Sequence, residues 1–170
     1  MPAPVHAGKT VDSVACGVLT VSDTRTPDTD TGGELIRNLL LSRGHRIHSY
    51  AIVKDQSEQV REMLESLRDD PVCAAVLLTG GTGLARRDTT YEAVVKLLDK
   101  QLHGFGELFR LKSYEQIGAA AMLSRAVAGV MVRTAVFSMP GSPAAVRLAM
   151  EELILPELGH IAYLLAEHDV

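Results

Sequence analysis

One short segment of the chain holds most of the residues that could do chemistry. Residues 79–90 read TGGTGLARRDTT, so three glycines stand within four positions, and two arginines and Asp88 follow. Glycine lets backbone N–H groups approach a phosphate closely, and arginine side chains match phosphate oxygens. An aspartate among anionic ligands can hold Mg²⁺ or orient a reacting group. The segment therefore favours a site for a phosphate-bearing ligand.

This glycine segment matches neither of the common nucleotide-binding loops. A Walker loop needs a lysine followed by serine or threonine, and the dinucleotide fingerprint needs the G-x-G-x-x-G spacing; both are missing here. Glycines between a strand and a helix can also serve tight turn geometry alone, so this alternative stays open. The six histidines are scattered and indicate no histidine metal site, and no pair of nucleophile and base stands out.

Two further polar turns and one aspartate can join the same site. Residues 22–33 read SDTRTPDTDTGG, residues 139–145 read MPGSPAA, and Asp55 follows the strand-like run RIHSYAIV. Ligands of parallel α/β sheets bind outside the carboxyl ends of the strands, and right-handed crossovers bring successive carboxyl ends to one side. We therefore expect the three turns to form one pocket. Ser142, followed by proline, is also a typical helix N-cap, which alone would explain its turn.

Helix capping gives a competing account of the acidic residues. Thr89 and Glu92 have the spacing of a capping box, and Asp88 would favour the positive end of the same helix. Asp55 or the nearby Ser57 could cap the helix that follows them. These structural roles and a catalytic role do not exclude one another.

Strand-like and helical patterns alternate along the chain, and they define what must position these turns. Strands are predicted from apolar runs at residues 15–22, 46–53, 73–78, 129–134 and 135–140. Helices are predicted where apolar residues recur at helical spacing, at residues 33–42, 56–68, from 90 onward, 144–155 and 157–168. Gly44 suits the end of the first helix. The alternation predicts an α/β fold with a mostly parallel sheet and helices on both faces.

Length and composition indicate one globular domain. The chain has 170 residues, of which 46% are hydrophobic and 22% charged, and it can bury a sizeable core. Its net charge of −4 argues against a general nucleic-acid-binding surface, although local basic residues still allow an anionic small ligand. Cys16 and Cys73 lie in or beside apolar runs, which predicts buried reduced thiols.

The N-terminal stretch MPAPVHAGKTVDS lacks the apolar core of a signal peptide, and no apolar run reaches the length of a membrane span. We expect a disordered leader at residues 1–13, a single domain at residues 14–170, a cytoplasmic location, and no binding to membranes or nucleic acids.

Taken together, the turns resemble those of the MoaB/Mog family of molybdenum-cofactor biosynthesis proteins. The matching stretches occur in family order from about Val21 to Pro143, and they read VSDTRTPDTDTGGELI, TGGTGLARRDTT, GFGELFR, SRAVAGV and MPGSP. Each motif alone is weak, but the ordered set is highly specific. The stretch GFGELFRLKSYEQIGAAAMLSRAVAGV is particularly similar to the MoaB branch. The resemblance implies a three-layer α/β/α fold of the molybdopterin-binding type that assembles into trimers, sometimes paired as hexamers.

The resemblance also implies binding of molybdopterin, a pterin that carries a dithiolene and a terminal phosphate. Catalytic members of the family use Mg²⁺ and ATP to adenylylate that phosphate and release pyrophosphate. The family's two acidic positions correspond to Asp55 and Asp88, and both are aspartate here, which favours an active molybdopterin adenylyltransferase. The alternative is a non-catalytic molybdopterin-binding or assembly protein of the same pathway. A third hypothesis is a general nucleotide- or phosphate-binding module, and the missing Walker lysine argues against it.

Asp55 and Asp88 are thus the predicted catalytic residues and the predicted Mg²⁺ ligands. Arg86 or Arg87 could stabilise charge that develops on the α-phosphate of ATP. The other predicted contacts to pterin or nucleotide lie in the three turns and in SRAVAGV. They are Ser22, Asp23, Thr31, Gly32, Thr79, Gly80, Gly81, Thr82, Gly83, Arg87, Ser124, Arg125, Pro140, Gly141 and Ser142.

The partners expected from the resemblance are molybdopterin, ATP, further copies of the chain in a homotrimer or hexamer, and transiently other cofactor-assembly proteins. The stretch HGFGELF, with its aromatic residues and glycines, suits close packing between subunits. Phe105 and Phe109 could instead pack within the core of their own chain.

Overall fold

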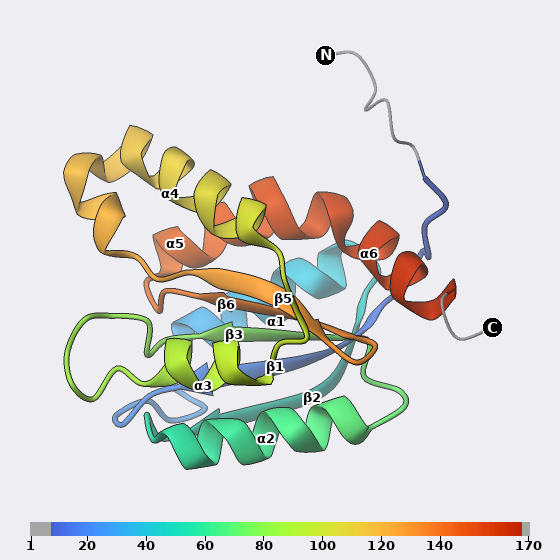
Figure 1. Ribbon diagram of the computed structural model, residues 1–170, viewed down its shortest axis with the longest axis horizontal. Helices are drawn as coiled ribbons and strands as arrows, with labels where there is room; N and C mark the ends of the chain where they lie inside the picture. The colour runs from blue at the N-terminus through green and yellow to red at the C-terminus, as the bar shows by residue number, and fades with distance from the viewer. Residues whose placement is uncertain (1–7, 168–170) are drawn as a thin grey trace.

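A computed structural model describes residues 8–167, and one six-stranded sheet runs through its centre (Figure 1). The strand order is β2-β1-β3-β6-β5-β4. The strands are β1 (Ala15–Val21), β2 (Arg46–Val53), β3 (Ala75–Thr79), β4 (Lys100–Gln101), β5 (Val127–Met131) and β6 (Thr134–Met139). Residues 1–7 of the predicted leader and His168, the end of the last predicted helix, lie outside the described residues.

The sheet is parallel over four strands and antiparallel over the rest. Strands β2, β1, β3 and β6 pair in parallel, whereas β5 pairs antiparallel with both β6 and β4. Only Val132 and Arg133 separate β5 from β6. A two-residue connection can only return the chain antiparallel, since a parallel pair needs a crossover. The mostly parallel sheet is confirmed, with this hairpin and the short edge strand β4 as additions.

Six α-helices surround the sheet within the described residues. They are α1 (Thr31–Ser42), α2 (Ser57–Asp69), α3 (Thr90–Leu97), α4 (His103–Ile117), α5 (Pro143–Leu148) and α6 (Leu155–Glu167). A 3₁₀-helix η1 (Gly118–Leu123) follows α4, and a π-helical segment η2 (Ala149–Ile154) joins α5 to α6. The two C-terminal helices predicted separately are therefore one continuous run. Helix α4 was not predicted.

The helices form two layers, one on each face of the sheet. Helices α2 and α3 pack on one face through Val60, Leu64 and Val94, among others. Helices α1, α4, α5 and α6 pack on the other face, where Ile36 and Phe109 are buried. Figure 1 shows α2 and α3 below the sheet and α4 to α6 above it. This arrangement confirms the three-layer α/β/α fold.

The aromatic residues of HGFGELF belong to the core of this chain. Phe105 and Phe109 are 8% and 1% exposed, and their ring centroids lie 6.3 Å apart. Phe105 also meets the ring of Phe137 edge to face, with centroids 5.6 Å apart. The prediction that these rings suit packing between subunits is wrong, because both are buried in the core of this chain.

Both cysteines are buried and free, as predicted. Burial raises the pKa of Cys16 to about 12.

Among residues 8–167, none of the helices combines the length and apolar character needed to cross a membrane.

Candidate functional site

The carboxyl ends of four parallel strands lie in register at one edge of the sheet. Val21 of β1 pairs with Val53 of β2, and Thr20 pairs with Thr79 of β3. Thr79 in turn pairs with Met139 of β6. The turns that follow these strands are therefore neighbours, which confirms that the three polar turns meet at one edge.

Two glycines bring the turns after β3 and β6 into contact. Gly80 has φ of +99°, and a Cβ at this position would overlap the carbonyl oxygen of Val21. Its N–H donates to the carbonyl oxygen of Met139 at 3.0 Å. A Cβ on Gly141 would lie 3.5 Å from the Cα of Gly80. The two backbones thus form a ridge, which we call the glycine ridge (Gly80 and Gly141), where only glycine fits at position 80.

A polar cavity of about 450 Å³ lies on one side of the glycine ridge. It is bounded by the ends of β1 and β3, the start of α1 and the turn before α5. Six predicted contact residues line it, namely Ser22, Gly32, Thr79, Gly80, Gly141 and Ser142. Five further lining residues were not predicted, and they are Thr20, Val21, Arg25, Asp30 and Pro143.

Asp30 is a buried carboxylate on the wall of this polar cavity. It is 3% exposed and accepts hydrogen bonds from the hydroxyls of Thr20 and Tyr50, both at 2.6 Å. It also caps α1 by accepting from the N–H of Gly33 at 2.9 Å. Burial and the bond to Asp30 raise the pKa of Tyr50 to about 12. Asp30 could have been predicted from its place just before the start of a helix, because aspartate is common at the N-cap position.

A second cavity of about 430 Å³ lies on the other side of the glycine ridge. Its apolar wall comes from α4 and η1, with Phe109, Ile117 and Leu123. The predicted contact residues on this side are Gly80, Gly81, Thr82, Gly83, Ser124, Pro140, Gly141 and Ser142. The ridge is thus shared by a polar and an apolar cavity, as a ligand with a phosphate and a ring system would need.

Asp55 supports the glycine segment from the neighbouring strand. Its Oδ1 accepts from the N–H of Thr89 at 3.0 Å and from the Thr89 hydroxyl at 3.1 Å. Its own N–H donates to Oδ1 of Asp23 at 3.1 Å. Its Oδ2 would lie 2.8 Å from a Cβ on Gly81, so it faces that glycine. Asp55 does not cap α2, because the N-cap of α2 is Gln56, whose side chain makes no cap bond to the helix.

The predicted capping box at α3 is wrong. The Thr89 side chain makes no cap bond and donates to Asp55, while Glu92 pairs with Arg125. Asp88 does not cap α3 either, since its Oδ2 accepts from the N–H of Ala85 at 2.9 Å and closes the preceding loop. In a capping box the carboxylate of Glu92 would accept from the N–H of Thr89, but that N–H donates to Asp55. The spacing of Thr89 and Glu92 could not reveal a partner that follows another strand.

The two aspartates have the chemistry that a magnesium ion requires. Oδ2 of Asp55 and Oδ1 of Asp88 accept no hydrogen bond from the residues that the structure describes, and Asp55 binds the residue next to Asp88. Mg²⁺ prefers such carboxylate oxygens and usually completes its shell with water and phosphate. Over residues 8–167, no three His, Cys, Asp or Glu side chains gather as a metal cluster. The two carboxylate oxygens without a hydrogen bond are of the donor type that would suit Mg²⁺ bound together with a phosphate.

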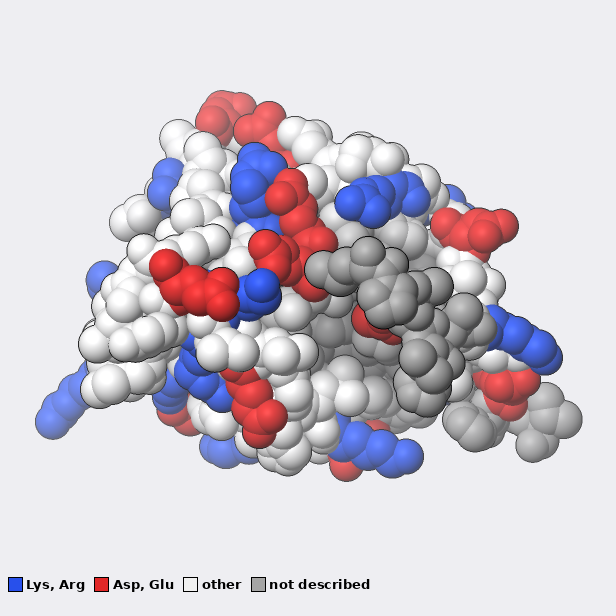
Figure 2. All heavy atoms as spheres, turned by 90° about the horizontal axis from the view of Figure 1, so that it is seen from above, with Lys and Arg blue, Asp and Glu red and all other residues white. Residues whose placement is uncertain are grey.

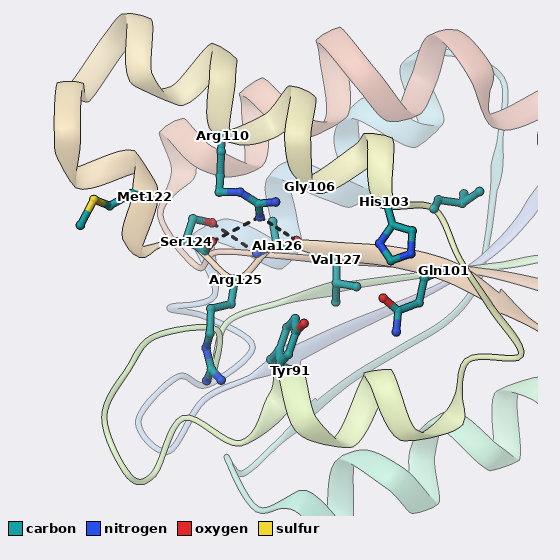
Figure 3. A pocket seen from close by; sticks show the side chains of 11 residues that line it. Tyr91, Gln101, His103, Gly106, Arg110, Met122, Ser124, Arg125, Ala126 and Val127 are labelled. Atoms are coloured by element: carbon teal, nitrogen blue, oxygen red, sulfur yellow. Dashed lines mark hydrogen bonds between the residues drawn. The ribbon is translucent and has the colours of Figure 1, made fainter.

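Asp55, Asp88 and several other predicted residues line neither of these cavities. Thr31 is exposed at the start of α1, and Asp23 is exposed in the turn after β1. Arg86 and Arg87 are exposed and make no hydrogen bond or ion pair with the described residues. Arg125 lines a third cavity between α3 and α4 and directs its guanidinium group away from it, onto the loop before α3 (Figure 3).

Comparison with known proteins gives a consistent result. The family described as "Probable molybdopterin binding domain" matches residues 17–160. Molybdenum cofactor biosynthesis protein B from Halalkalibacterium halodurans is 53% identical over 162 residues, which cover 95% of each chain.

Solved structures of similar proteins support the same family assignment. A crystal structure of molybdenum cofactor biosynthesis protein B has a TM-score of 0.90 and 52% identity, and the match covers 92% of this chain and 98% of that one. The tungsten cofactor synthesizing protein MoaB from Pyrococcus furiosus has a TM-score of 0.78 and 39% identity, and the match covers 91% of this chain and 98% of that one. The chain therefore belongs to the molybdopterin-binding domain family and is a molybdenum cofactor biosynthesis protein of the MoaB type.

Proposed function

We propose that this protein is a Mg²⁺- and ATP-dependent molybdopterin adenylyltransferase. One observation carries the proposal. The glycine ridge, with a cavity on each side, is supported by the loop that holds Asp88 and by Asp55, which binds that loop. Backbone amides beside two carboxylates can accept a phosphate and a metal–phosphate complex together.

In the proposed reaction, an oxygen of the pterin's terminal phosphate attacks the α-phosphorus of ATP. A new P–O–P bond forms, the bond between the α-phosphorus and the bridging oxygen breaks, and pyrophosphate leaves with the electron pair. Such reactions depend mainly on positioning and charge neutralisation. Magnesium, when bound, would neutralise phosphate charge. The chain itself contributes backbone amides of the glycine segment to orient the phosphate, apart from that of Gly80, which donates to Met139. The carboxylates of Asp55 and Asp88 would hold the metal.

Arg86 and Arg87 are the free cations nearest in sequence to Asp88. Because neither has an acidic partner among the described residues, either side chain can turn towards an anionic nucleotide. We assign them the role of neutralising charge on the α-phosphate.

The alternative function is that of a molybdopterin-binding or assembly protein without turnover. The observation that favours it is that neither the polar nor the apolar cavity beside the glycine ridge includes Asp55 or Asp88 in its lining. A protein of this kind would bind the pterin at the glycine ridge and leave ATP unchanged.

The test is to incubate the purified protein with molybdopterin, ATP and Mg²⁺ and to separate the pterins by chromatography. We expect adenylylated pterin to form only when ATP and Mg²⁺ are both present. A pterin that binds, detected by quenching of its fluorescence, but is recovered unchanged would support the binding protein instead.

We further propose that the protein assembles as a homotrimer or a pair of trimers through α4 and η1. Side chains that are at least half exposed line the outer side of these two helices, and they are Leu108, Leu111, Tyr114, Ile117, Met122 and Leu123. Uncharged atoms spread over the left part of the face in Figure 2, where α4 and η1 lie. A patch of this kind is typical of an interface between protein chains. A further copy of the chain is the occupant that the family resemblance favours.

We place the protein in the cytoplasm, because two free, buried thiols suit a reducing compartment.

A further inference from the structure

Arg125 gives its side-chain hydrogen bonds to the loop that precedes α3. Its Nε donates to the carbonyl oxygen of Thr82 at 3.3 Å, and its Nη2 donates to those of Gly83 at 2.6 Å and Asp88 at 3.0 Å. Its Nη1 pairs with Glu92 of α3. Arg125 therefore holds both ends of the loop from residue 82 to residue 88.

The first turn of α3 fixes the guanidinium group in place. The Glu92 carboxylate binds it, and the same pair holds the pKa of Glu92 below its usual range. The ring of Tyr91 lies under the guanidinium carbon, 5.0 Å from it. Figure 3 shows the Arg125 side chain pointing towards this loop, with Tyr91 beside it. A lysine could not reproduce this planar, forked set of contacts.

Few other contacts hold the loop. Leu84, Arg86 and Arg87 are exposed, and the bond from Ala85 to Asp88 lies within the loop itself. Bonds to the rest of the chain lie after Asp88, where the N–H and hydroxyl of Thr89 donate to Asp55 at 3.0 and 3.1 Å. The N–H of Thr90 also donates to the carbonyl oxygen of Gly81 at 3.2 Å. The position of Asp88 relative to Gly81 and Asp55 thus depends on how the loop is anchored.

We propose that Arg125 is a positioning residue, not a ligand contact: its guanidinium group clamps the loop from residue 82 to residue 88 and so sets the place of the Asp88 carboxylate. This inference rests on the proposed function for its effect on turnover, whereas the clamp itself can be tested without turnover. It revises the sequence-based prediction that Arg125 touches the pterin or nucleotide, because its donors already face three backbone carbonyls and one carboxylate.

A neighbouring arginine provides a matched control. Arg110 of α4 lines the same third cavity as Arg125 and donates to the carbonyl oxygens of Ser124 and Ala126, both at 3.4 Å. Figure 3 shows these bonds above the strand, whereas Arg125 lies below it. Arg110 makes no hydrogen bond to the loop. Arg110→Gln therefore removes a similar charge from the same region and spares the clamp.

The experiment compares the full-length protein with its variants Arg125→Gln, Arg125→Lys and Arg110→Gln under limited trypsin digestion. Trypsin cuts after arginine, so the exposed Arg86 and Arg87 report opening of this loop directly. We expect cleavage at these two sites to be roughly tenfold faster or more in Arg125→Gln, because local opening governs the rate of proteolysis. Arg110→Gln should be cut at the rate of the unchanged protein. Thermal melting shows whether each variant is folded.

Turnover provides the second readout. In Arg125→Gln we expect kcat for adenylylation to fall by up to about a hundredfold, a cost typical of a displaced catalytic group. The KM for ATP should change by less than about threefold, since Arg125 does not touch the nucleotide. In Arg125→Lys, the rise in cleavage rate and the fall in kcat should both be smaller than in Arg125→Gln, because one ammonium group can reach one or two of the carbonyls.

The clamp is overturned if Arg125→Gln leaves cleavage at Arg86 and Arg87 unchanged, or if Arg110→Gln accelerates it equally. A large rise in KM with unchanged kcat and unchanged cleavage would make Arg125 a ligand contact instead. If the unchanged protein shows no turnover, the proposed function fails while the cleavage rates still decide the clamp. If Arg125→Gln does not fold, Arg125→Lys decides by the same cleavage test.

Discussion

At the scale of single residues, the two aspartates singled out in the sequence have different surroundings. Asp55 is bound to Thr89 through one oxygen and faces Gly81 with the other. Asp88 stays within its own loop, where one oxygen accepts the N–H of Ala85. Each carboxylate therefore has one oxygen engaged in structure and one left for a ligand. This division allows a substitution that keeps the structural bond and removes only the charge.

Asp88→Asn is expected to abolish or severely reduce adenylylation while the fold persists. The asparagine oxygen can still accept from the N–H of Ala85, but the negative charge needed to hold a metal–phosphate complex is lost. We expect a rate loss of roughly a hundredfold or more, with a change in unfolding free energy below about 1 kcal/mol. Adenylylation assays and thermal melts of the two proteins measure both quantities. Unchanged activity would leave Asp88 a loop-closing residue and Asp55 the main candidate.

The thiols give a prediction about pH. Burial raises the pKa of Cys16 to about 12 and that of Cys73 above its usual value. The folded state therefore favours the neutral thiols, and their contribution to stability is complete below about pH 8.5, the usual thiol pKa. It is lost as the pH rises from there towards 12, so the melting temperature should fall over this range. Replacing both cysteines with alanine should weaken the fall.

The same burial predicts slow reaction of the folded protein with a thiol reagent at pH 8. Both thiols should react at once in denaturant. Fast labelling of either thiol in the folded protein would contradict the burial of that side chain.

At the scale of elements, the apolar runs predicted the strands well, because β1 and β3 are buried throughout. The carboxyl-edge pocket followed from them, since parallel strands place their ends together. Helix α4 could not be predicted in this way. It is only weakly amphipathic, with glycines in its first turns and apolar side chains on its exposed side as well as its buried one. A helix with that pattern lacks the periodic signal on which such predictions depend.

The predicted capping box of α3 is wrong for a different reason. Local spacing indicates a capping box, but Thr89 and Glu92 bind Asp55 and Arg125, which come from distant parts of the chain. Arg125 was predicted as a ligand contact, and its bonds to the backbone of the loop are the observation behind the proposed clamp.

The glycine ridge can be tested by one added methyl group. Gly80→Ala should cost about 1 to 3 kcal/mol, because φ of +99° is unfavourable for alanine and Val21 occupies the space. Affinity for molybdopterin should fall as well, since the ridge would shift. Gly104→Ala is the matched control, with no atom within 4 Å of the added Cβ and a helical position that suits alanine. Denaturant unfolding and fluorescence titration measure the two effects. Equal behaviour of the two variants would contradict the ridge as described.

At the scale of the whole molecule, the candidate site lies at the carboxyl edge of the sheet. The exposed apolar side chains lie on the outer side of α4 and η1. Ile117 and Leu123 belong to both, because they also line the apolar cavity beside the glycine ridge. A partner chain docked on α4 would therefore lie close to that cavity. Assembly and ligand binding are expected to stabilise each other.

Leu111→Asp should dissociate the assembly. Leu111 is 58% exposed in the single chain, so a charge there costs little unless a partner covers it. Light scattering should give about three or six times the 18.3 kDa chain mass for the unchanged protein and a smaller mass for the variant. Val132→Asp is the control, as Val132 is 65% exposed on the β5–β6 hairpin. An unchanged protein that stays monomeric at all working concentrations would contradict the assembly.

In the proposed reaction, the phosphate of molybdopterin receives AMP at the glycine ridge. The most direct measurement is to incubate the protein with molybdopterin, Mg²⁺ and ATP labelled with ³²P at the α-phosphate, and to follow the label. We expect the label to move to the pterin, with one pyrophosphate released per label transferred, and we expect chelation of Mg²⁺ to stop the transfer. Molybdopterin that binds to the protein while all label remains in ATP would contradict it.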